Sequence, residues 1–208
     1  MPTIDETEWE RSRERYTAWW SHGLLDRPLL RVLAPREPGA TPPQPRDPHE
    51  QWLDGEYRLR RFAWELEHLY YGGDAFPLFE PQLGPGSLAI HLGSPPVFTP
   101  ETVWYDPIIT DLATAPLPRY DPDERYWVFT KELAREARRR FGDRALVGFP
   151  DLIENVDILA SLRGAQALLI DLVDHPAHVH RFQEAILRAL VGCRVQPALT
   201  YLANAIGD

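Results

Sequence analysis

The stretch from Gly72 to Gly93, GGDAFPLFEPQLGPGSLAIHLG, decides the expected fold. Its two leading glycines are typical of the end of a helix. A five-residue apolar run, Ala75–Phe79, follows and has the length of a buried strand. The loop 80–86 is rich in proline and glycine and does not fit a regular element. Helix, strand and elaborate loop in this order predict the carboxyl end of an α/β strand, where such enzymes place their sites.

The rest of the chain repeats the alternation of helix and strand. Strands that alternate with long helices indicate an α/β fold with a parallel sheet. A (β/α)8 barrel typically takes about 250 residues. The 208 residues therefore predict a single domain that holds an N-terminal helix and half to two thirds of a TIM-type barrel. The segment 189–208, nearly free of charge, is an atypical tail. Helices are expected at 5–22, 48–71, 121–141, 158–173 (with a break at 163–164) and 176–191, strands at 29–34, 75–79 and 145–149, a helical turn at 87–92 and a hairpin at 95–105.

Composition narrows the range of partners. The formal net charge of −9 opposes nucleic-acid binding, which needs a basic surface. The single cysteine excludes an internal disulfide. No apolar run approaches the roughly 20 residues that cross a bilayer, and the charged N-terminus lacks the apolar core of a secretory signal. We therefore expect a cytoplasmic protein that acts on a small molecule, without membrane or nucleic-acid partners.

Charged side chains follow each predicted strand. Arg36 follows the first, Glu80 the second, and Asp151, Glu154 and Asp157 follow the third. Because strand ends of a parallel sheet meet at one edge, these groups are expected around one cleft. Clustered carboxylates raise each other's pKa, which favours acid–base work or cation binding. The alternative is that the two aspartates cap helices and that the Glu80 side chain is solvated.

Two further residues are candidates for the site. His91 follows the glycine-rich loop and is a candidate acid or base, or else a residue that satisfies the loop backbone. Tyr105 is a candidate for the aromatic wall of a substrate site, with a place at the edge of the core as the alternative. The histidines at 175, 178 and 180 lack the spacing of four residues that places two imidazoles on one helix face. No metal site is expected in this chain.

Five patterns occur in a fixed order over residues 16 to about 190: WW…DRP-L-L-R-V-x-A-P-R, YYGGDAFP…LGPG, TVWYDPII, VGFPDLIENVDILASLRG and LLIDLVDHP. Together they resemble the uroporphyrinogen decarboxylase superfamily, and more narrowly its decarboxylase-like branch. The resemblance implies a TIM-type barrel with its cleft at the carboxyl ends of the strands. It also implies the carboxy-lyase chemistry of porphyrin metabolism, or the methyl transfer of relatives that serve corrinoid proteins.

The resemblance also suggests roles for individual residues. Arg31 and Arg36 match the region in which the decarboxylases contact substrate carboxylates. Phe79-Glu80-Pro81 stands where they have an F-S-D sequence, so the acid is shifted by one residue. We expect three catalytic residues, Glu80, Asp151 and Asp157. The expected substrate-binding residues are Arg31, Arg36, His91, Tyr105, Glu154 and Asn155.

The zinc ligands of the methyltransferase relatives, a His-x-Cys pair and a distant cysteine, belong to the second half of the barrel. We therefore expect no cofactor in this chain; zinc or a corrinoid would require ligands from that second half. The expected function is that of a decarboxylase-like lyase acting on a carboxylated small molecule. The alternatives are a corrinoid-linked methyltransferase and a non-catalytic, truncated chain that needs a partner. Open barrel edges predict a homodimer or other association.

Overall fold

The computed structural model describes residues 6–152 and 155–194, and about half of them are helical. The mixed α/β class expected from the sequence is confirmed. The helices are α1 Glu6–Trp20, α2 Pro48–Leu53, α3 Gly55–His68, α4 Leu88–His91, α5 Arg125–Phe141, α6 Asn155–Arg163, α7 Ala165–Asp174 and α8 Pro176–Arg194. The strands are β1 Arg31–Pro35, β2 Leu69–Gly73, β3 Leu78–Phe79, β4 Pro96–Phe98, β5 Val103–Tyr105 and β6 Leu146–Val147.

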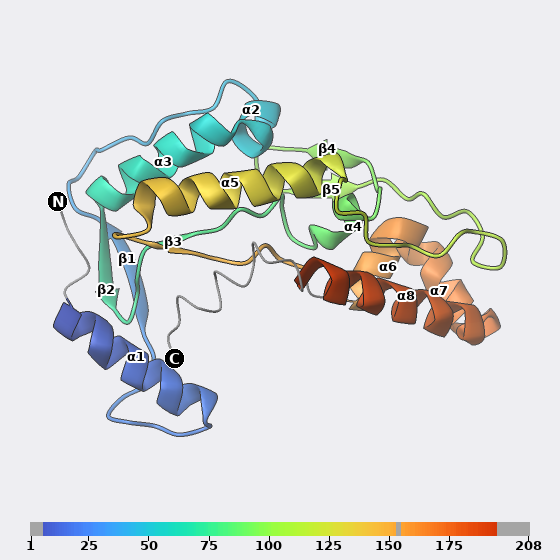
Figure 1. Ribbon diagram of the computed structural model, residues 1–208, viewed down its shortest axis with the longest axis horizontal. Coiled ribbons are helices and arrows are strands. Elements are labelled where there is room, and N and C mark those ends of the chain that lie inside the picture. Colours follow the sequence, from blue (N-terminus) through green and yellow to red (C-terminus); the bar gives the residue numbers. More distant parts are fainter. Residues whose placement is uncertain (1–5, 153–154, 195–208) are drawn as a thin grey trace.

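The strands form three separate two-stranded sheets: β1 with β2 and β4 with β5 are antiparallel, and β3 with β6 is parallel. The parallel pair agrees with the expected arrangement of 75–79 and 145–149. The described residues do not form a closed barrel (Figure 1). The expectation that 29–34 joins the same parallel sheet is wrong, because β1 pairs with β2 instead, with Arg31 opposite Gly73 and Pro35 opposite Leu69.

The prediction of one long helix over 48–71 is also wrong, at two positions. Asp54 divides it: its backbone N–H closes α2, and its side chain caps α3 by accepting a hydrogen bond from the Tyr57 backbone N–H at 2.8 Å. At the other end α3 stops at His68, and Leu69 turns to extended dihedral angles. Gly73 therefore ends a strand rather than a helix. Its φ of 70° and its close approach to the Leu30 carbonyl leave no room for a side chain.

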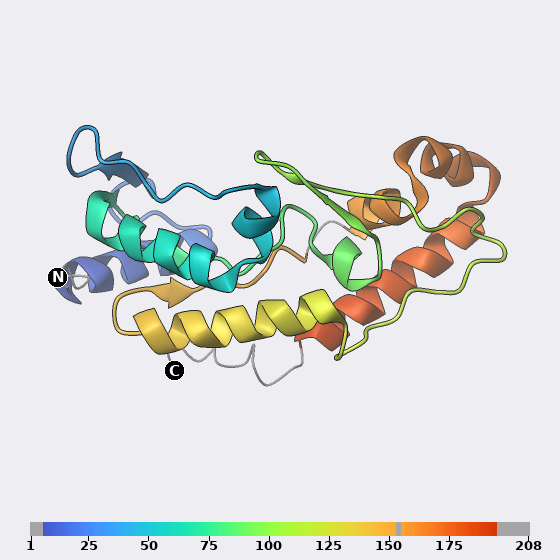
Figure 2. The same ribbon diagram turned by 90° about the horizontal axis from the view of Figure 1, so that it is seen from above.

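Helices α3 and α5 lie side by side over one face of the β3–β6 pair (Figures 1 and 2). Alternate residues of each strand enter the core beneath these helices, whereas Leu78 and Leu146 on the other face are only half-buried. Burial on one face and partial exposure on the other follow from the alternation of side chains along a strand. The core members are Leu59, Phe62, Leu66, Phe79, Leu133, Ala137, Phe141, Ala145 and Val147.

A second core joins α4, α6, α7 and α8. Helix α5 connects it to the first core, because Trp127 near its start is fully buried in the second and Phe141 at its end is buried in the first. Glu124 caps α5 by accepting hydrogen bonds from the backbone N–H groups of Tyr126 and Trp127 at 3.0 and 2.8 Å. The helix therefore begins four residues later than the sequence predicts.

Several local predictions are confirmed. The helical turn at 87–92 is α4, and the hairpin at 95–105 is formed by β4 and β5. The break expected at 163–164 divides α6 from α7 at Gly164, where φ is 89°. The atypical tail lies mostly outside the described residues, but its first part, 189–194, continues α8.

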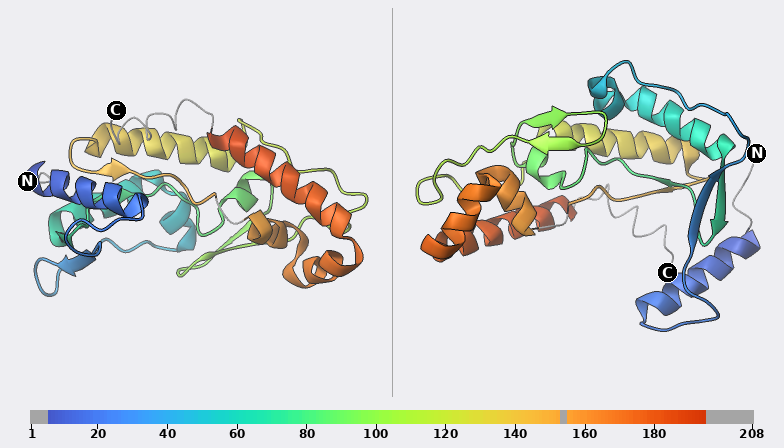
Figure 3. Two further views of the ribbon diagram at one scale, coloured as in Figure 1. Left: turned by 90° about the horizontal axis from the view of Figure 1, so that it is seen from below. Right: turned by 180° about the vertical axis from the view of Figure 1, so that it is seen from behind.

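Helix α1 and the β1–β2 pair extend away from the two cores (Figure 3). The fully buried carboxylate of Asp74 holds this arm together. It accepts hydrogen bonds from Arg15 Nη1 at 3.1 Å, from Arg27 at 2.5 and 3.1 Å, and from the Leu30 backbone N–H at 3.0 Å. Burial raises the pKa of this carboxyl, but the hydrogen bonds outweigh burial and lower the pKa below its usual value. In the described part of the chain, no helix is long and apolar enough to cross a membrane.

We predict that Asp74→Asn lowers the free energy of unfolding by about 3 to 5 kcal/mol, because it leaves two arginines without their buried partner. Urea unfolding followed by circular dichroism measures this. Asp26→Asn is the matched control: Asp26 binds Arg15 at 2.8 Å, but its side chain is 51% exposed. We expect Asp26→Asn to lower the free energy of unfolding by about 1 kcal/mol or less. Equal losses in the two variants would contradict the role assigned to Asp74.

Candidate functional site

The structure brings together two of the predicted loops. Because β3 and β6 run parallel, the loops that follow them leave at the same end of the pair. The Gly86 backbone N–H donates to Asp151 Oδ2 at 3.4 Å, and Ser87 Oγ donates to the Asp151 carbonyl at 2.9 Å. Asp151 thus fixes the glycine-rich loop. Glu80, at the start of that loop, is exposed.

The predicted arginines lie in a different sheet. Arg31 is exposed at the start of β1, whose partner is β2 and not β3. The Arg36 Nε donates to the Leu69 carbonyl at 2.9 Å, and the Arg36 backbone N–H donates to the His68 carbonyl at 2.7 Å. Arg36 therefore extends the β1–β2 pairing by one residue. Strand pairing does not place these two arginines beside Glu80.

Three predicted residues belong to the segment after β6. Asp157 is exposed in the first turn of α6, inside the helix rather than at its cap. The Asn155 Oδ1 is buried and has no hydrogen-bond partner among the described residues. Glu154 lies outside the described residues.

His91 and Tyr105 support the loops from within. His91 is buried at the end of α4, with its Nδ1 3.4 Å from the Glu124 Oε2 and its ring 5.1 Å from that of Trp127. Burial lowers the pKa of His91, so the ring is neutral at pH 7. The Tyr105 hydroxyl lies 2.9 Å from the Leu83 carbonyl and 3.0 Å from the Pro85 carbonyl, and burial raises its pKa. Tyr105 thus fastens the glycine-rich loop (residues 80–86), whereas His91 joins α4 to the start of α5.

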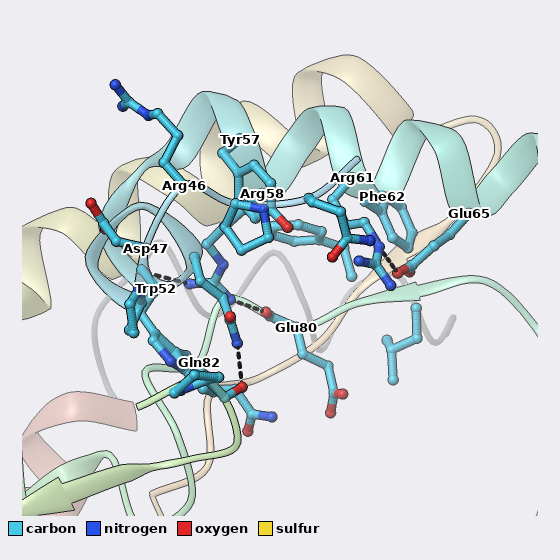
Figure 4. Close-up of a pocket in the computed structure, with 17 residues that line it drawn as sticks. Arg46, Asp47, Trp52, Tyr57, Arg58, Arg61, Phe62, Glu65, Glu80 and Gln82 are labelled. Atoms are coloured by element: carbon cyan, nitrogen blue, oxygen red, sulfur yellow. Dashed lines mark hydrogen bonds and ion pairs between the residues drawn. The ribbon is translucent and has the colours of Figure 1, made fainter. Parts of the chain in front are cut away.

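A cavity of about 800 Å³ lies between the proline-rich loop that joins β1 to α2 (residues 36–47), α2, α3 and the end of β3 (Figure 4). Its volume is within the usual range for small-molecule sites. Of the predicted site residues, Glu80 alone lines it. The other lining residues are Gln44, Pro45, Arg46, Asp47, Pro48, Gln51, Trp52, Tyr57, Arg58, Arg61, Phe62, Glu65, Leu78, Phe79, Gln82 and Pro100.

Arg58 is the central charged group of this cavity. Its Nη2 donates to the Glu80 carbonyl at 2.8 Å and its Nη1 to the Trp52 carbonyl at 3.4 Å, and the guanidinium lies 5.9 Å from the centroid of the Phe79 ring. Burial lowers the pKa of Arg58 to about 10, which still leaves it charged at pH 7. A guanidinium has five N–H donors, so donors remain for a ligand. Within 6–152 and 155–194, no carboxylate forms an ion pair with Arg58.

Apart from Arg58 and Glu80, each charged side chain at the cavity forms an ion pair or caps a helix. Arg46 Nε lies 3.1 Å from Glu50 Oε1, and Arg61 Nε lies 3.0 Å from Glu65 Oε1. The Asp47 carboxylate caps α2 by accepting a hydrogen bond from a backbone N–H at 2.8 Å. Among the described residues, Arg58 and Glu80 are therefore the charged groups of the cavity that neither form an ion pair nor cap a helix.

Sequence reasoning missed Arg58. The apolar stripe of its helix includes Leu59 and Phe62, and Arg58 stands one residue before the first and four before the second. A charged residue that borders an apolar stripe is the available signal, because it lies at the edge of the buried face. Nothing local to the helix shows that the proline-rich loop closes over it.

Among the residues that the structure describes, no group of three or more histidine, cysteine, aspartate or glutamate side chains is arranged to hold a metal ion. Comparisons of the chain with models of protein families, with curated proteins and with solved structures found no match. The basis for a function is therefore the geometry of the cavity together with the sequence resemblance.

We predict that the stability contributed by His91 is present above pH 6.5 and is lost as the pH falls below it. The unfolded chain then binds a proton that the buried, neutral ring does not bind, so acid favours unfolding. Glu124 titrates lower: burial raises its pKa, but its hydrogen bonds lower the pKa below 4.5 overall. Urea unfolding should show a smaller difference in the free energy of unfolding between wild type and His91→Gln at pH 5.5 than at pH 7.5. His180→Gln, at an exposed position of α8, controls for loss of a histidine. A difference that is the same at both pH values would contradict a neutral buried His91.

Proposed function

We propose that this protein binds a small carboxylated molecule in the cavity beneath the proline-rich loop, with Arg58 as the anchor. One observation carries the proposal: a half-buried guanidinium, without a carboxylate partner in the described part of the chain, borders a cavity of about 800 Å³. A guanidinium presents its donors in a planar fork that matches a carboxylate, and such paired hydrogen bonds are among the strongest in proteins. The group that this site accepts best is therefore a carboxylate.

For the reaction, we propose the carboxy-lyase class suggested by the resemblance to the uroporphyrinogen decarboxylase superfamily. Two structural features support a partial TIM-type barrel. Strands β3 and β6 are parallel and joined through α5, with the helices on one face. The glycine-rich loop and the Asp151 loop leave at the same end of that pair and contact each other. Such strand ends are where barrel enzymes hold substrates.

A second candidate function is that of a non-catalytic chain that acts only in association with another copy of itself or with another protein. Large hydrophobic side chains are exposed on α1, on the loop after it and on β1, and the sheets of the described residues are only two strands wide. Exposed apolar surface and open strand edges favour association. The exposed side chains of this arm are Trp19, Trp20, Leu24, Leu25, Leu30, Val32, Leu33 and Tyr70.

We predict that Arg58→Gln weakens the binding of carboxylates by about 10- to 100-fold, as expected for loss of a charge-assisted hydrogen-bonded pair. Isothermal titration with a series of mono-, di- and tricarboxylates measures this. Arg60→Gln is the matched control, because Arg60 belongs to the same helix and is exposed outside the cavity. Arg58→Lys, which keeps the charge, should retain part of the affinity. Equal weakening by both glutamine variants would contradict a specific anchor.

For the second candidate, light scattering of the purified chain should give at least twice the mass of one chain. Trp20→Gln should lower the associated fraction, because Trp20 is 74% exposed at the end of α1. A monodisperse monomer with a single cooperative thermal transition would contradict association.

A further inference from the structure

The charges of the cavity specify more than a carboxylate. Six charged residues line it: Arg46, Asp47, Arg58, Arg61, Glu65 and Glu80. Partners or a helix cap engage four of them, as described above. The two that form no ion pair and cap no helix in the described structure are Arg58, which donates only to uncharged backbone carbonyls, and Glu80, and their charges have opposite signs. A ligand that satisfies both members needs an anionic and a cationic group.

The two groups are also neighbours. Arg58 donates to the backbone carbonyl of Glu80 itself at 2.8 Å, so the guanidinium and the Glu80 side chain start from adjacent points of the cavity wall. In Figure 4 the Glu80 carboxylate extends away from that hydrogen bond, and no ion pair joins it to Arg58 in the part of the chain that is described. The carboxylate therefore does not neutralise the guanidinium, although both face the same cavity.

We propose that the ligand is an amino-carboxylate of the α-amino acid type, whose carboxylate binds Arg58 and whose ammonium group binds Glu80. The carboxylate half depends on the proposed function; the ammonium half is new. An α-amino acid carries one group of each sign, and Arg58 and Glu80 line the same cavity with the Arg58 guanidinium bonded to the Glu80 backbone carbonyl. A ligand with a single negative charge would leave Glu80 to repel it.

Part of the remaining cavity wall is apolar and can contact an apolar side chain on that ligand. The Trp52 indole N–H is already engaged with the Thr99 carbonyl at 2.8 Å, so the ring offers only apolar surface. The amide groups of Gln44 and Gln51 donate to the Pro42 and Pro100 carbonyls at 3.0 and 2.8 Å. Leu78 and Phe79 supply further apolar surface. Amino acids with aromatic or large aliphatic side chains can use this apolar part of the wall and are the first ligands to test.

Isothermal titration with matched pairs of ligands tests the inference. Each apolar L-amino acid is compared with its deaminated acid, for example L-phenylalanine with 3-phenylpropanoate and L-leucine with 4-methylpentanoate. We expect at least one amino acid to bind about tenfold tighter than its deaminated partner, since a charge-assisted hydrogen bond contributes that much. Glu80→Gln should abolish this preference and should not weaken binding of the deaminated acid, because the variant removes a carboxylate that repels this ligand. Glu67→Gln, at an exposed position of α3 outside the cavity, should keep the preference.

The outcomes separate the two levels of the proposal. Equal affinities for amino acids and deaminated acids, with loss of both in Arg58→Gln, would overturn the amino-acid assignment and leave the carboxylate site standing. A preference that survives Glu80→Gln would overturn the role of Glu80. Failure of every carboxylate and every amino acid to bind the folded wild-type chain would overturn both. Thermal unfolding of each variant confirms that it is folded, and the exposed position of Glu80 makes a large loss of stability unexpected.

Discussion

The buried carboxylate of Asp74 is the interaction on which the N-terminal half of the structure depends. It draws together side chains of α1 and of the loop before β1, at the point where β2 ends and the chain turns toward β3. The Tyr16 hydroxyl donates to the Asp74 carbonyl, and its ring packs against Phe76 on the way to β3. A buried charge is stabilising only while its hydrogen bonds are complete. The cluster thus fixes the chain just before β3, and pairing with β6 and burial of Phe79 then place the strand itself.

Local sequence patterns predict most of the helices. They fail where pairing with a segment far away in the chain determines the secondary structure. The stripe of α3 continues in helical spacing to Leu69, so nothing in the sequence near it shows that the helix ends at His68. Leu69–Gly73 becomes a strand because Arg31–Pro35 pairs with it, more than 30 residues earlier in the chain. Aromatic residues such as Tyr70 are compatible with either state, and the tertiary pairing selects one. The break at Asp54 does have a local signal, because Asp-Gly dipeptides, here Asp54-Gly55, mark turns.

The site shows the same division. The strand-end rule correctly brings the loops of Glu80 and Asp151 to one end of the sheet, because it depends only on parallel pairing. It fails for Arg36, whose strand pairs elsewhere and whose guanidinium is engaged by the Leu69 carbonyl. Arg58 is invisible to the rule because it belongs to a helix before the strand. Its environment comes from four segments: the proline-rich loop, α2, α3 and the end of β3 at Glu80. Only their assembly turns an ordinary helix residue into an unneutralised cation.

The overall charge of the chain and the charges of the cavity favour the same ligand. A net charge of −9 repels anions that come within about a Debye length of the surface, about 8 Å at physiological salt. A simple carboxylate must cross this field before it reaches Arg58, so added salt should speed its association. A zwitterion carries no net charge and meets no such barrier at any ionic strength. Once inside, it encounters Arg58 and Glu80 at short range, and partial burial of Arg58 weakens the screening of its charge by salt. The acidic surface and the local pair of charges therefore both discriminate in favour of an amino acid over its deaminated acid.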